Sequence, residues 1–200
     1  MKSEMYTEQE ILNAIKTSTL KIMNPIGFII DEICDCLLLN KYVAATTATN
    51  LLLEETLKLA LIFHDSNGKT LDDGVEFENM YQAEVEQNID IILSHNIEKA
   101  YKAGLIDNGG KDELHYLRKT FRNPFSHGSF NDIIKEAKTT IAVANIADVS
   151  NIQYKKVPVK DQPLLYYIAK QKFLKSEALG YFLLVYKYVC SFDEKLQQLY

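Results

Sequence analysis

Apolar residues recur at three- and four-residue spacing along most of this chain, the pattern typical of amphipathic helices. The stretch Thr7 to Glu10 reads TEQE, which has the Thr-x-x-Glu form of a helix capping box, and apolar residues follow it at helical spacing. Asn24-Pro25 ends this first helix, because the residue before a proline resists the helical conformation. The same spacing predicts further helices over residues 28–39 and 42–63.

A polar, glycine-containing loop follows over residues 64–79. Asn79 can then cap one long helix, and Gly104 is placed to end it. Residues 107–110, DNGG, predict a turn, and the apolar spacing resumes in a helix over residues 112–122.

The remaining third of the chain contains the only stretch that is poor in helical signals. Ser129 and Asp132 form a second capping pattern that starts a short helix. Residues 139–160 are rich in β-branched side chains and predict a hairpin or an irregular insertion. Helices then continue to the C-terminus, with a kink near Gly180. We therefore expect a single all-α domain, residues 1–200, built as a bundle of five to seven helices with one insertion.

Composition limits the classes of protein that this chain can belong to. With 200 residues, 47% of them apolar, it can bury a substantial core. The 22 basic and 27 acidic residues give a net charge of −5, which argues against a histone-like coat on nucleic acid but leaves room for a local basic site. An acidic N-terminus and the lack of a 20-residue apolar run predict neither an export signal nor a membrane span, and three cysteines fit a reducing cytoplasm.

Other candidate sites are better explained as ordinary structure. Asp65, Asn67, Asp73 and Glu76 resemble a calcium loop, but Thr70 occupies the position that needs glycine, so a solvated loop is the preferred interpretation. The three cysteines lack metal-ligand spacing and are predicted to fill the core. We therefore expect no metal and no cofactor.

The stretch RNPFSHG, residues 122–128, differs from the rest of the chain. The chain has only two arginines, Arg118 and Arg122, and both lie here, four residues apart and therefore on one face of a helix. Together with Lys119 they form a local positive site, and His127 follows after a proline. A guanidinium holds two phosphate oxygens at once, and an imidazole titrates near neutrality, so the combination suits phosphoryl transfer in RNA.

The spacing Arg122, four residues, His127 resembles the R-x4–6-H motif of the HEPN superfamily, whose members are all-helical domains and include many metal-independent ribonucleases. Polar Asn123 after the arginine and an amphipathic helix before it add to the resemblance, which covers the chain outside the 139–160 insertion. The resemblance implies a homodimer in which two motifs share one cleft and cut RNA by attack of the ribose 2′-hydroxyl.

The same resemblance assigns roles to individual residues. His127 would act as general acid or base, Arg122 would stabilise charge on the phosphorus, and Asn123 would orient one of these groups. Arg118 and Lys119 would hold the RNA backbone, and Ser126 would assist. Many such proteins act in phage defence or toxin–antitoxin systems, so an antitoxin partner is a further expectation.

Two other interpretations remain open. Some HEPN members do not cut RNA and serve as dimerisation, nucleotide-binding or partner-binding modules, for example beside a nucleotidyltransferase. In the other, Arg122 ends a helix and His127 is a buried residue that holds a kink. Retention of both motif residues favours the nuclease among the HEPN interpretations.

Overall fold

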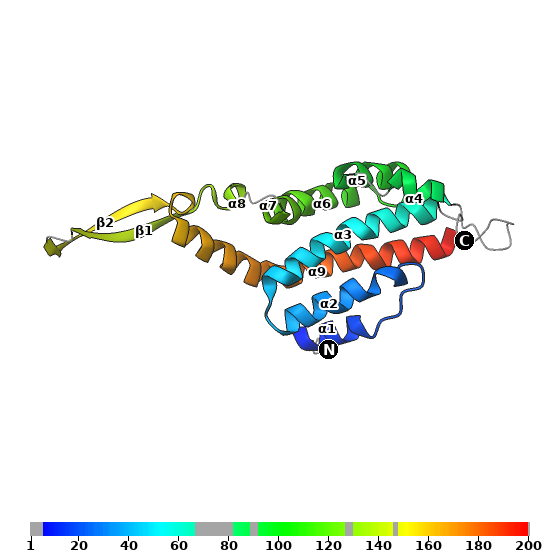
Figure 1. The fold of residues 1–200 in the computed structure, drawn as a ribbon, viewed down its shortest axis with the longest axis horizontal. Helices are drawn as coiled ribbons and strands as arrows, with labels where there is room; N and C mark the ends of the chain where they lie inside the picture. Colours follow the sequence, from blue (N-terminus) through cyan, green and yellow to red (C-terminus); the bar gives the residue numbers. More distant parts are fainter. Residues whose placement is uncertain (1–5, 67–81, 89–91, 127–129, 146–147, 200) are drawn as a thin grey trace, which may run out of the picture.

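The fold was analysed in a computed structural model of the full chain, and the structure describes residues 6–66, 82–88, 92–126, 130–145 and 148–199. Helices form the body of the molecule, and one two-stranded hairpin projects from it (Figure 1). The expected all-α bundle with a small hairpin is therefore confirmed.

Three helices precede the first undescribed internal segment. Helix α1 covers Glu8–Lys16 and begins with the predicted capping box, in which the side chain of Thr7 accepts from the backbone of Glu10 and the side chain of Glu10 accepts from the backbone of Thr7. Helix α1 ends at Lys16, where Thr17 caps it, so the expectation that Asn24-Pro25 ends the first helix is wrong; Pro25 lies in a separate 3-10 turn, η1 (Asn24–Ile26). Helices α2 (Gly27–Leu38) and α3 (Tyr42–Asp65) agree closely with the predicted spans.

The long helix predicted between residues 79 and 104 is wrong, because the chain forms two helices there, α4 (Gln82–Asn88) and α5 (Leu93–Lys102). Ile92 is extended, with ψ of 144°. Tertiary hydrogen bonds account for the break: the buried side chain of Asn88 donates to Asp65 and accepts from Lys99. Asn79, the predicted cap, lies outside the described residues.

Gly104 ends α5 as predicted, with φ of +73° in the left-handed region that glycine adopts without strain. The amide of Gly104 donates to the carbonyl of Tyr101, and the amide of Leu105 donates to the carbonyl of Ala100. This pair of bonds is the Schellman pattern of helix termination. The predicted turn at residues 107–110 is wrong. Helix α6 (Asn108–Leu117) begins there, because Oδ1 of Asp107 accepts from the amide of Gly110 at 2.7 Å and caps it.

The C-terminal part begins with the π-helical turn η4 (Arg118–Arg122), α7 (Asn123–Ser126) and α8 (Asn131–Ile134). The cap residue of α8 is Phe130, whereas the predicted cap, Ser129, lies outside the described residues. Strands β1 (Lys138–Asn145) and β2 (Asp148–Pro158) pair antiparallel, which confirms a hairpin in the predicted insertion.

A 3-10 turn, η5 (Val159–Asp161), leads from the hairpin into α9 (Pro163–Leu199), which runs through Gly180 as one helix of 37 residues. At 1.5 Å per residue this helix is about 55 Å long. Its C-terminal half packs against α3 in the middle of the bundle, with α1 and α2 on one side and α5 and α6 on the other (Figure 1).

Two apolar clusters hold these elements together. The larger one fills the bundle, and residues such as Leu53 and Phe182 on α3 and α9 are at most 1% exposed. The smaller one joins Phe130, Ile134 and Val159 at the base of the hairpin. The motif predicted from sequence therefore lies between the main core and a second, smaller core that supports the hairpin.

Candidate functional site

The sequence predicted that the helix ends at the motif. In the structure the helix continues through the motif segment, which forms a wider turn. Pro124 has no amide hydrogen, and its ring would collide with the carbonyl four residues back in a regular α-helix. The amide of Asn123 instead donates to the carbonyl of Arg118, five residues back, and η4 is a π-helical turn. The helical path then continues through α7 to Ser126. Single π-helical turns inside helices are frequent at functional sites.

Arg122 is fixed by a residue from a distant part of the chain. Its Nε donates to Oε1 of Glu54 on α3 at 2.8 Å. The side chains of Arg122 and Glu54 are 24% and 27% exposed, so the pair lies at the edge of the core and is still reached by solvent. A charge-assisted bond of this kind holds the guanidinium of Arg122 against α3.

The residue before Arg122 anchors the same turn in the core. The ring of Phe121 stacks on that of Tyr181 with centroids 4.1 Å apart and planes 4° apart. The hydroxyl of Tyr181 donates to Oδ1 of Asn50, one turn before Glu54 on α3. Burial raises the pKa of Tyr181. The nearby carboxylate of Glu54 raises this pKa further, and the nearby guanidinium of Arg122 lowers it. Asn50, Glu54, Phe121, Arg122 and Tyr181 therefore form one cluster between α3, η4 and α9.

The other predicted motif residues surround this cluster. Arg118 begins η4 and is half-buried, and among the described residues its buried Nε has no hydrogen-bond partner. Lys119 is exposed, and Asn123 is half-buried at the start of α7. The structure therefore places Arg118, Lys119 and Arg122 on the one turn η4, and Glu54 from α3 binds Arg122.

Phe125 joins the motif to α9. Its ring packs on those of Phe130 and Phe173, with centroids 5.7 and 6.1 Å away. Nζ of Lys170 lies 5.0 Å from the centre of the Phe125 ring, a cation–π contact that adds a further positive charge beside the motif.

Two predicted site residues cannot be placed in this geometry. His127 lies outside the described residues, and of Ser126 the structure describes only the backbone, at the end of α7. A second histidine near the arginines, His115, has a partner elsewhere: its Nε2 lies 3.0 Å from Oε1 of Glu98 on α5.

Sequence reasoning missed Glu54, Asn50 and Lys170. Each acts on the motif across a tertiary contact, and Glu54 is 68 residues away from Arg122 in sequence. The available signal was the placement of Glu54 after three leucines on a largely apolar helix, where a half-buried carboxylate needs a partner.

Within the described ranges, no three His, Cys, Asp or Glu side chains lie close enough together to hold a metal ion. Of the residues named as a calcium-loop candidate, Asp65 is described and contacts His64, whereas the others lie in the undescribed 67–81 segment. No helix in the described part of the chain is both long and apolar enough to cross a bilayer.

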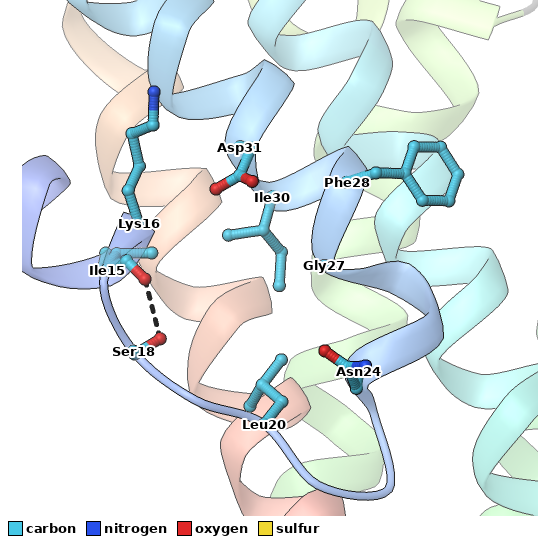
Figure 2. Close-up of a pocket in the computed structure, with 9 residues that line it drawn as sticks. All are labelled: Ile15, Lys16, Ser18, Leu20, Asn24, Gly27, Phe28, Ile30 and Asp31. Carbon is cyan, nitrogen blue, oxygen red and sulfur yellow. Dashed lines mark hydrogen bonds between the residues drawn. The ribbon is translucent and has the colours of Figure 1, made fainter.

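A separate pocket of about 330 Å³ lies between the end of α1 and the start of α2 (Figure 2). Ser18 closes the turn after α1 by donating from Oγ to the carbonyl of Ile15 at 2.7 Å. Lys16 at the rim is neutralised by Asp35, whose Oδ1 lies 2.6 Å from its Nζ. No residue of the arginine-containing turn lines this pocket, so we treat it as separate from the candidate site.

Comparison of the chain with protein-family models, with curated proteins and with solved structures finds no significant match.

Proposed function

We propose that this protein is a metal-independent endoribonuclease of the HEPN type, with Arg122 and His127 as its central residues. The observation that carries the proposal is the fixed orientation of Arg122: Glu54 binds its Nε, and Phe121 secures the same turn by stacking on Tyr181. A catalytic cation needs such positioning, because a charge that must reorganise during the reaction stabilises the transition state poorly.

The proposed reaction requires two proton transfers and one charge stabiliser. The ribose 2′-hydroxyl attacks the adjacent phosphorus while a base removes its proton, and the 5′-oxygen leaves with a proton from an acid. His127 supplies one of these groups, and the same histidine of a second copy supplies the other in a homodimer with facing motifs. Arg122 stabilises the charge on the phosphoryl oxygens, and Asn123 orients the phosphate or the imidazole.

Positive charge around this centre supports the choice of an RNA substrate. Arg118 and Lys119 share the turn with Arg122 and would contact neighbouring phosphates. Biological settings that fit the proposal are phage defence and toxin–antitoxin systems, with an antitoxin as the regulatory partner.

The Glu54–Arg122 ion pair also supports a second candidate function. In that alternative Arg122 has a purely structural role, and the domain is a non-catalytic module that dimerises or binds a nucleotide or a partner such as a nucleotidyltransferase. The two candidates differ in whether RNA is cut.

The deciding experiment incubates purified protein with RNA in the presence and absence of EDTA and analyses the product ends. We expect cleavage in EDTA, 2′,3′-cyclic phosphate and 5′-hydroxyl ends, and no cleavage of the same sequence as DNA, which lacks the attacking hydroxyl. The His127→Ala protein is the control for a contaminating nuclease. Its cleavage rate should be at least 10²-fold lower, which is the usual loss when a general acid or base is removed. Failure of the wild-type protein to cut, or 5′-phosphate products, would reject the proposal.

A further inference from the structure

Positive charge is concentrated in one part of this acidic protein. Residues 135–175, which we call the basic arm, contain eight lysines and three acidic residues, a net charge of +5. The other 159 residues contain 14 basic and 24 acidic residues, a net charge of −10. The basic arm contains the hairpin β1–β2, the turn η5 and the first turns of α9.

The lysines of the basic arm face solvent. Seven of the eight are exposed, and Lys170 is half-buried over Phe125. In the hairpin, Thr140 pairs with Lys156 and Ala142 with Tyr154, so alternate residues on both strands share one face. The described members of this face include Lys138, Lys156 and Tyr154, and Tyr154 is 75% exposed.

The first turns of α9 carry exposed side chains of the same kinds. Leu164, Tyr167, Ile168, Lys172 and Lys175 are all exposed and recur at three- and four-residue spacing, which places them along one side of the helix. Tyr167 is 67% exposed. Exposed lysines interspersed with exposed tyrosines are the combination that binds single-stranded nucleic acid, by phosphate contacts and by stacking of bases on the rings.

The basic arm packs against the motif. Phe173 on α9 packs against Phe121, Phe125 and Phe130, with centroids 5.7, 6.1 and 5.4 Å away. The hairpin extends beyond the helical body at this end of α9 (Figure 1). Because a strand rises about 3.3 Å per residue, the 11 residues of β2 span about 35 Å.

We propose that the basic arm is an RNA-binding surface that holds the strand flanking the cleaved phosphate. This inference rests on the proposed function for the identity of the ligand, and charge complementarity selects nucleic acid over an apolar protein partner. It implies that the substrate extends well beyond the cleaved bond, and that part of the affinity lies outside the cleavage site.

The test measures binding of a fluorescent single-stranded RNA of about 20 nucleotides to the full-length His127→Ala protein over a range of salt concentrations. We compare the background protein with the pairs Lys138→Gln/Lys156→Gln, on the one face of the hairpin, and Lys172→Gln/Lys175→Gln on α9. Each lost phosphate contact lowers the slope of log affinity against log salt by about 0.7, so each pair should lower it by about 1.4. Tyr154→Ala should weaken binding about ten-fold at every salt concentration.

The matched control is Lys21→Gln/Lys41→Gln, which removes two exposed lysines that flank α2 and lie outside the basic arm. This pair should leave both affinity and slope unchanged. All of these proteins should melt at the temperature of their parent, because the substituted side chains are exposed. In the cleavage-competent protein, the two basic-arm pairs should raise KM and leave kcat unchanged.

The outcomes separate this inference from the proposed function. If wild-type protein cuts RNA and the basic-arm pairs bind it with an unchanged slope, the inference is wrong and the nuclease stands. If the slope falls as expected but RNA is never cut, the basic arm binds RNA and the nuclease proposal fails. If the pairs leave RNA binding unaffected and change only self-association in light scattering, the surface is a protein interface and the inference is overturned.

Discussion

Arg122 donates from Nε to Oε1 of Glu54 at 2.8 Å, so the motif arginine is held by a residue of α3 that precedes it by 68 positions in the sequence. A regular α-helix through residues 118–126 would present its side chains in a different register, because the π-helical turn accommodates one more residue per helical turn than an α-helix does. Pro124, by preventing the usual backbone bond, therefore contributes to the position from which Arg122 reaches Glu54.

A double-mutant cycle should detect this pair as an energetic coupling. We expect Glu54→Ala and Arg122→Ala to destabilise the protein separately, and the double variant to be less destabilised than the sum, by about 0.5–3 kcal/mol. The reason is that each single variant leaves one partly buried charge without its partner. Urea denaturation provides the measurement. Strict additivity would show that the pair contributes nothing to the folded state.

Glu54→Gln serves as the matched control in this cycle. Glutamine keeps an acceptor oxygen at the same position and removes the charge, so the variant should fall between wild type and Glu54→Ala in stability. If the proposed function holds, Glu54→Gln should also slow RNA cleavage, because a neutral amide holds the guanidinium less firmly than a carboxylate does.

The stack of Phe121 on Tyr181 should dominate the stability of the motif turn. Phe121→Ala removes a ring that is 5% exposed and should cost about 3–5 kcal/mol in free energy of unfolding. Tyr181→Phe keeps the stack but leaves Oδ1 of Asn50 without this donor, and should cost about 1–3 kcal/mol. Both values come from urea denaturation. Tyr116→Ala, at a position 59% exposed on α6, is the control and should change stability by less than about 0.5 kcal/mol.

Stability should also depend on pH through Glu98, which links α5 to α6. His115 and then Lys111 hydrogen-bond its carboxylate and lower its pKa. A carboxyl whose pKa is lowered by folding stabilises the protein above its unfolded pKa, near 4.3, and this contribution is lost as the pH falls through the lower folded value. Glu98→Gln should therefore flatten the loss of melting temperature between about pH 5 and pH 3.

The control for this prediction is Glu177→Gln, which removes the same charge at an exposed position of α9. Its melting temperature should follow that of the wild type across the same acidic range. Equal flattening in both variants would mean that overall charge, and not the contacts of Glu98, governs the acid response.

Local signals predicted those parts of the fold that depend on neighbouring residues. The Thr7–Glu10 capping box, the glycine that ends α5 and the hairpin all arise from interactions within a few residues or from backbone preferences. The break before α5 was missed because a hydrogen bond from Lys99 to Asn88 and another from Asn88 to Asp65 favour it, and a periodicity count includes neither bond.

The candidate site was predicted only as far as it is contiguous in sequence. Two arginines and a polar residue next to a proline are visible in the printed chain, and the structure places Arg118 and Arg122 on the turn η4 and Asn123 directly after it at the start of α7. Glu54 and Lys170 reach the motif from α3 and α9 through tertiary packing, so neither could be assigned to it without the fold. The π-helical turn was missed because proline was assumed to end the helix.

Arg122→Lys is the substitution that best separates catalysis from structure. Lysine keeps a positive charge beside Glu54, so the variant should retain an ion pair and melt within a few degrees of the wild type. It cannot present the planar fork that holds two phosphoryl oxygens together. If Arg122 stabilises the transition state, cleavage should fall about 10²–10³-fold, close to the loss in Arg122→Ala.

Arg118→Ala provides the contrast within the same turn. If Arg118 contacts only the RNA backbone, its removal should weaken binding and lower the salt dependence while leaving the maximal rate intact. If Arg122 has only a structural role, Arg122→Lys should cut RNA as fast as the wild type, because the lysine can also pair with Glu54. Rates of RNA cleavage and melting temperatures of Arg122→Lys, Arg122→Ala and Arg118→Ala therefore decide the matter. A stable Arg122→Lys protein that cuts RNA at the wild-type rate would remove the basis for assigning this arginine to catalysis.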